Sequence, residues 1–450
     1  MKLTGTQIAQ ATGGTLVRDA GAGEVLTDTR ALTPGTWFLA LVGERFDGHA
    51  FLDQAKAAGA HGVVVDRPVP DWAGGVVRVT DTMAAMADLG RWARAQVSVP
   101  VVGITGSSGK TTTRALVALA LSPLGAIHQT VGNLNNHLGV PMTLLATPHG
   151  SDALVVEMGT SSPGEIEHLA RVATPTHRLI VNVGPAHLEE LGGLDGVRRE
   201  KGALFDTAGP DDVLLVNVDD ARLCSYQAAL GQRIVRWGRG SDADIQLLDV
   251  HLDAGRLTTH LRVRGPDGEV AATLPAFGVH FALNATAALA LAYAVGIDLG
   301  EAAAKLAEYE PVGMRQRMVT LPTGALVLND AYNANPASVK AALDTLAGLG
   351  GRGIAALGDM LELGAHEQRL HAEVVGYAES LGLERLLLVG PRMALAASHA
   401  PSAHVFDHPD AAAATLVGTL GPQHRLLVKG SRGMAMERIL QPLTTTPEVG

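Results

Sequence analysis

The sequence predicts an α/β protein of three domains. At 450 residues the chain is too long for one ordinary hydrophobic core, and two to four domains are expected. From residue 101 onward, short apolar runs end in polar or glycine-rich turns and alternate with helical stretches, which is typical of buried parallel strands joined by helices. The 53 glycines suit the many tight strand-to-helix turns of such a fold.

Changes in this pattern divide the chain into three regions. Residues 1–97 combine short strands at 37–42 and 62–66 with helices at 50–58 and 83–96, which predicts a smaller α/β domain. Residues 98–313 predict a central domain with a parallel sheet like that of P-loop ATPases. Residues 314–450 predict a Rossmann-like α/β domain, and residues 311–313 form a hinge candidate before it.

The parallel strands locate the expected binding sites. They are predicted at 101–105, 153–157, 179–183 and 213–218 in the central region, and at 325–328, 353–357, 385–389 and 425–428 in the last. Residues 243–275 alternate in polarity around a turn at 265–268, which predicts an antiparallel patch, and a helix is predicted at 284–295. Ligands of open α/β sheets bind outside the carboxyl ends of strands, so we expect functional residues in the turns there.

Composition excludes several classes of function. The net charge of −10 argues against a general nucleic-acid-binding surface. The single cysteine, Cys224, allows no intrachain disulfide and is expected to be a passive packing residue. The first residues lack the pattern of a signal peptide, and no apolar run reaches the roughly 20 residues of a membrane span. A cytoplasmic protein without membrane insertion is therefore expected.

A glycine-rich loop follows the predicted strand 101–105 and precedes a helical stretch. Its glycines let successive amides face one anion, its lysine adds a mobile charge, and its first threonine can bind Mg²⁺. Ile104 stands where the full Walker pattern has glycine, so the match is to a shortened form; the alternative is an ordinary turn with a surface lysine. We expect the loop to bind ATP or GTP through Gly106, Ser107, Ser108, Gly109, Lys110, Thr111 and Thr112.

Three further residues lie where metal ligands would be expected. Glu157 ends one predicted strand, His187 lies just past another, and Lys201 follows in the segment 199–202. Taken singly, they could be a cap, a packed or solvated histidine and a surface charge. Their common position after strands that follow a phosphate loop favours a functional role, with Thr111, Glu157 and His187 supplying ligands to Mg²⁺.

These motifs together resemble the Mur ligase family over nearly the whole chain, and the shortened loop is the usual form in that family. Similar segments occupy residues 28–30, 34–35, 38–41, 43–49, 132–136, 139–141, 157–159, 182–187, 330–336, 357–364 and 429–432. The last three are particular to the branch that adds D-alanyl-D-alanine. The segment that marks the diaminopimelate-adding relatives is absent from the sequence.

The resemblance implies roles for individual residues. Lys201 matches a lysine that is N-carboxylated in many relatives and holds Mg²⁺ with Glu157 and His187; Lys110, Glu157, His187 and Lys201 would form the catalytic set. Asn284, Arg315 and Asp330 would contact the nucleotide. Phe281 departs from the family pattern near adenine and could stack or simply pack. The residues implied for substrate binding are Asp28, Thr29, Arg30, Arg45, Asp47, His49, Asn133, Asn135 and Asn136.

The implied reaction joins D-alanyl-D-alanine to a UDP-N-acetylmuramoyl-tripeptide through an acyl phosphate, with ATP and Mg²⁺, in a protein expected to be monomeric. Other readings remain open at this point. One is another Mur enzyme or a folylpolyglutamate synthase; the motifs at 28–30 and 43–49 disfavour the folate enzyme, which lacks a UDP-sugar domain. Another is a nucleotide switch or motor, although no guanine-specific Asn-Lys-x-Asp segment occurs. A third is an inactive relative, against which the intact Lys110, Glu157 and Lys201 argue.

Overall fold

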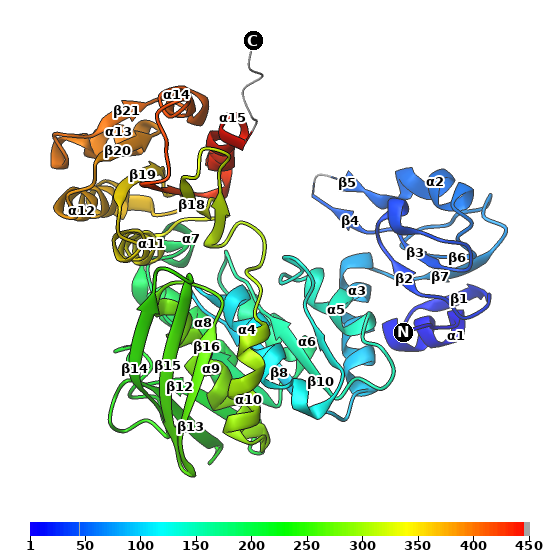
Figure 1. The fold of residues 1–450 in the computed structure, drawn as a ribbon. Helices are drawn as coiled ribbons and strands as arrows, with labels where there is room; N and C mark the ends of the chain where they lie inside the picture. The colour runs from blue at the N-terminus through cyan, green and yellow to red at the C-terminus, as the bar shows by residue number, and fades with distance from the viewer. Residues whose placement is uncertain (45, 445–450) are drawn as a thin grey trace. The chain divides into compact units, whose positions relative to one another are not determined.

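The computed structural model describes residues 1–44 and 46–444, and it confirms the predicted α/β class. Three main sheets of five, nine and six strands carry helices on their faces, and strands β4 (Val42–Gly43) and β5 (Phe46–Asp47) form a small ribbon (Figure 1). The chain divides into two compact units. The first contains residues 1–104, 124–160 and 164–178, and the second contains residues 105–123, 161–163 and 179–450.

The five-stranded sheet belongs to the first unit and has the order β1-β7-β6-β3-β2. Its strands are β1 (Thr15–Arg18), β2 (Val25–Leu26), β3 (Trp37–Leu39), β6 (Gly62–Val65) and β7 (Gly75–Arg78). β1 is antiparallel to β7, and the other neighbours are parallel. Helices α1 (Gly5–Thr12), α2 (Leu52–Ala57) and α3 (Thr82–Ala95) accompany it. The helix predicted at 50–58 begins as a 3₁₀ turn, Gly48–Phe51, capped by the Asp47 carboxylate.

The nine-stranded sheet has the order β16-β15-β14-β13-β12-β11-β8-β10-β9. Strands β8 (Val101–Thr105) and β10 (Ala153–Glu157) have the predicted bounds and pair with each other in parallel. Every residue of both strands is buried, as expected for continuous apolar runs in a parallel sheet. β9 (Ile127–Gln129) is parallel to β10, and β12 (Val213–Asn217) is parallel to β13 (Arg233–Gly238). β11 (His177–Ile180) lies between β12 and β8. β11 ends earlier than predicted, because the backbone at Asn182 and Val183 bonds to other loops.

The predicted antiparallel patch is confirmed. Strands β14 (Ile245–Asp253), β15 (Thr258–Gly265) and β16 (Gly268–Leu274) lie side by side in Figure 1, with antiparallel pairing and the turn between Gly265 and Gly268. The central helices are α4 (Lys110–Ala120), α5 (Gly139–Leu145), α6 (Glu165–Ala173), α7 (Leu188–Leu191), α8 (Leu194–Asp206), α9 (Val279–Val295) and α10 (Leu299–Lys305).

Helix α9 begins at Val279, before the predicted start at Asn284, and packs against α4. Gly278, with φ of 145°, forms the entry to this helix, and its amide donates to Thr259 Oγ1 at 3.1 Å. The helix is buried on nearly every side, so its start carries little of the amphipathic periodicity on which a sequence prediction depends.

The six-stranded sheet has the order β17-β18-β22-β19-β20-β21. Its strands are β17 (Arg317–Thr320), β18 (Leu326–Asp330), β19 (Arg352–Gly358), β20 (Arg385–Val389), β21 (His404–Phe406) and β22 (His424–Lys429), all parallel to their neighbours except β17. Helices α11 (Pro336–Gly348), α12 (Glu367–Ser380), α13 (Pro391–Ala396), α14 (Pro409–Ala414) and α15 (Gln441–Thr444) pack with it. Asp330, predicted in a turn, is the last residue of β18.

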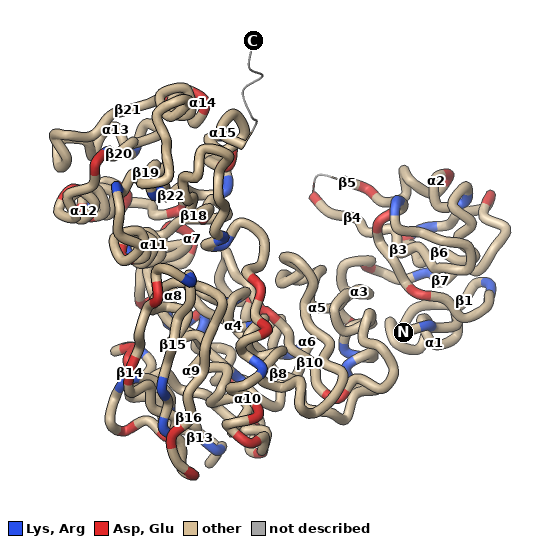
Figure 2. The backbone as a smooth tube through the Cα atoms, in the orientation of Figure 1, with Lys and Arg blue, Asp and Glu red and all other residues tan. Residues whose placement is uncertain are grey.

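Charged side chains are spread through both units, with acidic and basic residues interspersed along the backbone (Figure 2). Within residues 1–44 and 46–444, no helix combines the length and the apolar character that crossing a membrane would require. The domain bounds 1–97, 98–313 and 314–450 stay predictions, since the two compact units divide the chain differently.

Candidate functional site

The phosphate loop connects the end of β8 to the start of α4. Gly109 has φ of 77°, and a Cβ atom there would lie 3.0 Å from Asn284 Oδ1, so glycine is required for both conformation and space. Helix α4 begins at Lys110 directly after this glycine, which offers no side chain as a cap. The first amides of a helix need partners, and an anion seated in the loop would supply them.

The loop is held in shape by the turn that follows β11. Ser107 donates its amide to Asn182 O at 3.1 Å and its hydroxyl to Gly184 O at 2.9 Å, and the Ser108 amide donates to Asn182 Oδ1 at 3.0 Å. The Val183 amide donates to Asp220 Oδ2 at 2.6 Å. Sequence reasoning included Asn182 in the segment 182–187 that resembles a metal-binding motif but gave it no role of its own, and it gave Asp220 none.

Two lysines of the predicted site lie in this unit. Lys110 Nζ donates to Gly106 O at 2.8 Å, while Lys201, on α8, is only 1% exposed. Burial lowers the pKa of Lys201 well below its usual value, the charge of Lys110 lowers it further, and Glu200 opposes both. Thr111, also predicted to bind metal, is 1% exposed in the first turn of α4. The neutral amine of Lys201 is therefore favoured far more than in an exposed lysine.

His187 immediately precedes α7 and has a left-handed backbone, with φ of 53°. Its Nδ1 lies 2.6 Å from Glu362 Oε2. The contact with His187 holds the pKa of Glu362 below its usual value, while partial burial opposes this. Glu362 follows β19 in the last sheet and was not among the predicted site residues.

Glu157 belongs to the first unit and is the last residue of β10. Its side chain is buried, and Oε1 accepts a hydrogen bond from Asn135 Nδ2 at 2.9 Å. The Asn135 amide donates to Asn133 O at 2.7 Å, and Asn136 Oδ1 accepts from the Gly139 amide at 2.9 Å at the start of α5. Asn135 therefore orients Glu157 and Asn136 fixes a helix start, whereas substrate contacts of these asparagines stay predictions.

Among the residues that the structure describes, no three or more His, Cys, Asp or Glu side chains are arranged to hold a metal ion. Of the four predicted ligands, only Glu157 and His187 are residues of these types. The other two are Thr111 and a modified Lys201. The set stays a prediction.

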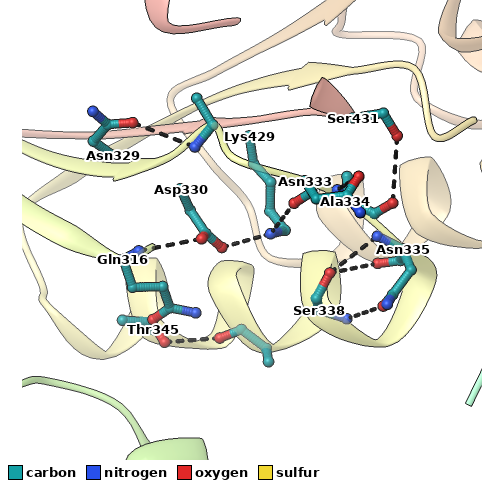
Figure 3. A network of polar contacts seen from close by, with 12 residues as sticks. Gln316, Asn329, Asp330, Asn333, Ala334, Asn335, Ser338, Thr345, Lys429 and Ser431 are labelled. Carbon is teal, nitrogen blue, oxygen red and sulfur yellow. Dashed lines mark hydrogen bonds and ion pairs between the residues drawn. The ribbon is translucent and has the colours of Figure 1, made fainter. Parts of the chain in front are cut away.

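A polar network joins the ends of β18 and β22 to the turn before α11 (Figure 3). Lys429 Nζ lies 2.5 Å from Asp330 Oδ2 and donates to Asn333 O at 2.9 Å. The Gln316 amide donates to Asp330 Oδ1 at 3.2 Å. Burial raises the pKa of Asp330, and Lys429 opposes this shift. The predicted ribose contact is thus a buried, paired carboxylate.

The other predicted nucleotide contacts lie around this network and the phosphate loop. The guanidinium of Arg315 stacks on Tyr332, 4.0 Å from the ring centroid. Asn335 caps α11 by accepting from the Ser338 amide at 2.9 Å, and its Nδ2 makes a long contact of 3.4 Å with Ser107 O in the phosphate loop. Phe281 is 1% exposed and packs against Tyr309, so of its two possible roles the structure shows core packing.

The predicted sugar-nucleotide residues form local charge pairs in the first unit. Asp28 accepts from Arg30 at 2.7 Å, and Thr29 Oγ1 donates to Gln54 Oε1 at 3.1 Å. His49 lies between two carboxylates, with Nδ1 2.7 Å from Asp47 and Nε2 3.3 Å from Asp66. Arg45 lies outside the described residues.

Comparison with known proteins gives this arrangement a family. Residues 104–292 match the Mur ligase middle domain, and residues 314–432 match the Mur ligase glutamate ligase domain. The chain belongs to the Mur ligase family. It is 38% identical to the UDP-N-acetylmuramoyl-tripeptide–D-alanyl-D-alanine ligase of Escherichia coli K12, covering 93% of both chains.

Solved structures point to the same member of the family. The MurF crystal structure from Acinetobacter baumannii superposes with a TM-score of 0.91 at 32% identity, covering 99% of each chain. The Thermotoga maritima MurF complex with ADP gives a TM-score of 0.84 at 26% identity, covering 94% of this chain and 97% of that one. The resemblance inferred from the motifs is confirmed, and so is the predicted fold class.

Proposed function

We propose that this protein catalyses the ATP-dependent joining of D-alanyl-D-alanine to a UDP-N-acetylmuramoyl-tripeptide in cytoplasmic peptidoglycan precursor synthesis, releasing ADP and phosphate. The observation that carries the proposal is the phosphate loop with Lys110, bonded to the turn after β11. The buried Lys201, whose pKa the charge of Lys110 lowers, belongs to the same unit. The E. coli relative named above carries this activity in its name, and the T. maritima relative was crystallised with ADP.

The chemistry requires activation because a free carboxylate is a poor electrophile. The terminal carboxylate oxygen of the tripeptide attacks the γ-phosphorus of ATP, forming an acyl phosphate and releasing ADP. The amine of D-alanyl-D-alanine then adds to the acyl carbon, the tetrahedral intermediate expels phosphate, and the amine loses a proton. The net products are the amide of the pentapeptide, ADP, phosphate and one proton.

The protein's main task in the first step is to neutralise and align charge. The amides of the phosphate loop and Lys110 would hold the transferred phosphoryl group, and Arg315 would reach it from the last sheet. Tyr332 stacks beneath Arg315 and restricts its guanidinium, which lowers the entropy cost of placing it on an anion. Asn284 and Asp330 would contact the rest of the nucleotide.

The residues present suit Mg²⁺ if Lys201 is N-carboxylated. A neutral amine is the form that adds CO₂, and the burial of Lys201 beside the charge of Lys110 favours that form. The product is an anion with oxygen donors, which Mg²⁺ prefers. Thr111 and Glu157 would hold one ion, and Glu157, His187 and carboxylated Lys201 a second. Bound Mg²⁺ would screen the repulsion between the substrate carboxylate and ATP.

The sugar nucleotide would bind to the first region of the chain. We assign this contact to Asp28, Thr29, Arg30, Arg45, Asp47 and His49, with Asn133, Asn135 and Asn136 nearer the reacting end. The charge pairs among the first set would rearrange or be shared with the ligand, since the side chains of Arg30, Asp28 and Asp47 are 88%, 44% and 41% exposed. We propose three domains, at residues 1–97, 98–313 and 314–450. Residues 311–313 would be the hinge that connects the last domain.

The assay that tests the function is phosphate release by the purified protein. We expect release with ATP and Mg²⁺ only when UDP-N-acetylmuramoyl-tripeptide and D-alanyl-D-alanine are both present, and a UDP-linked pentapeptide by mass spectrometry. Omitting either substrate, or replacing both by a folate and glutamate, should leave only background release. Turnover with the folate pair, or none with the peptide pair, would refute the proposal.

A further inference from the structure

Glu362 approaches His187 more closely than any side chain of the predicted site does. Its Oε2 lies 2.6 Å from His187 Nδ1, although the contact lacks the angles of a hydrogen bond, and this buried nitrogen has no hydrogen-bond partner in the described part of the chain. The Glu362 side chain is 50% exposed and that of His187 is 22% exposed. The Glu362 end of this contact is half exposed whereas His187 Nδ1 itself is buried, so solvent screens the contact from the Glu362 side only.

The backbone of both residues is strained. His187 has φ of 53° and Glu362 has φ of 63°, a left-handed conformation that costs a non-glycine residue about 1–2 kcal/mol. Strain of this kind persists where the surroundings enforce it, and it is concentrated at functional sites. Here two strained residues, one before α7 and one in the loop after β19, are in contact through their side chains.

The loop that carries Glu362 is fixed on both sides. The Met360 amide donates to His371 Nε2 at 3.0 Å, and the Leu361 amide donates to Ser431 Oγ at 2.9 Å. At Gly364 the chain lies so close to α7 that an added Cβ would be 3.0 Å from Glu189 Cβ. The loop therefore packs directly against α7, the helix that His187 precedes. These contacts fix the backbone position of Glu362 relative to His187.

We propose that Glu362 is a positioning residue for His187. Its carboxylate, 2.6 Å from Nδ1, would accept a hydrogen bond from Nδ1–H after a small rotation of the ring, which would fix the ring orientation and leave Nε2 as the lone-pair nitrogen available to a metal. Histidines that bind metals generally donate their other nitrogen to a carboxylate or carbonyl, and loss of that partner weakens metal binding about ten- to hundredfold. The inference rests on the proposed function, in which His187 is a metal ligand.

A rival arrangement predicts the opposite result. If Nδ1 were the nitrogen that binds the metal, Glu362 would occupy the metal's place, and its removal would tighten metal binding. The two arrangements therefore differ in the sign of one measured change.

The experiment uses full-length protein labelled with ¹⁵N-histidine, with the His187→Ala variant assigning the His187 signals. In metal-free protein we expect His187 in the Nδ1–H tautomer, and Glu362→Ala should shift it toward the Nε2–H form. Mn²⁺ titration in the presence of ADP, followed by electron paramagnetic resonance, should show binding weakened about tenfold or more in Glu362→Ala. Glu362→Gln, which still accepts a hydrogen bond, should be intermediate.

Glu190→Gln is the matched control, because Glu190 is an exposed carboxylate on α7 close to His187 in sequence. It should leave both the tautomer and Mn²⁺ binding unchanged. An unchanged tautomer in Glu362→Ala, or unchanged or tighter Mn²⁺ binding, would overturn the positioning role. If His187→Ala itself left Mn²⁺ binding unchanged, the metal-ligand role of His187 would fall as well, whereas the ligase assay would still decide the reaction.

Discussion

Breaking the buried pair Asp330–Lys429 by removing one partner should destabilise the second unit by several kcal/mol, in contrast to breaking exposed pairs of similar length. The Lys429 side chain is 2% exposed and that of Asp330 is 9% exposed, with 2.5 Å between Nζ and Oδ2. Asp330→Asn would leave the ammonium group buried without its anion, which typically costs about 3–5 kcal/mol. Asn333 O remains 2.9 Å from Nζ, so we expect the lower end of this range.

Lys429→Met should behave differently because its partner can take up a proton. Burial already raises the pKa of Asp330, and removing Lys429 would raise it further. A carboxyl group whose pKa is higher in the folded than in the unfolded protein favours folding below its unfolded pKa, and this contribution is lost as pH rises through the folded pKa. The stability deficit of Lys429→Met should therefore shrink as the pH is lowered through the raised pKa of Asp330 toward the ordinary pKa of an aspartate.

The assay is urea unfolding with linear extrapolation, followed by a probe in the second unit. Lys305→Met is the control, since Lys305 and Glu308 are 2.9 Å apart but 41% and 59% exposed, and the cost there should be about 0.5 kcal/mol or less. If Asp330→Asn cost no more than Lys305→Met, or if the Lys429→Met deficit did not change with pH, the description of this network as a buried ion pair would be wrong.

Three further predictions concern the phosphate loop, its Lys110, and Lys201 on α8. Lys110→Ala should abolish ADP release, and normal turnover would exclude a role in phosphoryl transfer. Lys201→Ala should lose activity and partly regain it with short carboxylic acids, which can replace the carbamate; no recovery at any concentration argues against that group. Gly109→Ala should cost about 1–2 kcal/mol of strain and weaken ATP binding by displacing Asn284, whereas Gly150→Ala, with φ of 83° and open space around it, should only lower stability.

The fold could be predicted where apolar runs are buried on both faces. β8, β10 and β20 have the predicted bounds because each is a continuous apolar run that stops at a polar or glycine turn. β1 is exposed at every residue and β9 is half-buried throughout, so neither shows the run on which the prediction depends. Most of the strands that were missed are short or lie at edges, where a sequence need not be apolar to pair. β13 is an exception, since it is a six-residue central strand whose two arginines interrupt the apolar run.

The candidate site divides in the same way. The phosphate loop is local and could be read directly, since its conformation depends on consecutive residues. The contacts of Asn182 with that loop and of Glu362 with His187 join residues far apart in sequence, and they follow from which strands are neighbours. Spacing along the chain does not encode that order. Similarly, Asn136 was predicted to touch substrate, but only the structure shows it fixing the start of α5.

The burial of Lys201 makes a last prediction that separates charge from size. A permanently cationic side chain at this buried position would lose its hydration and be repelled by the charge of Lys110. Lysine avoids both costs because the same two effects lower its pKa and favour the neutral amine. Arginine cannot lose its charge in a protein and cannot carry a carbamate through a neutral amine.

Lys201→Arg should therefore be less stable than Lys201→Ala and inactive, and short carboxylic acids should not rescue it, because the guanidinium fills the space that the acid needs. Thermal unfolding and phosphate release with and without added acetate measure both effects. An active Lys201→Arg enzyme would show that positive charge at this position, rather than the anion formed from it, is what the reaction needs.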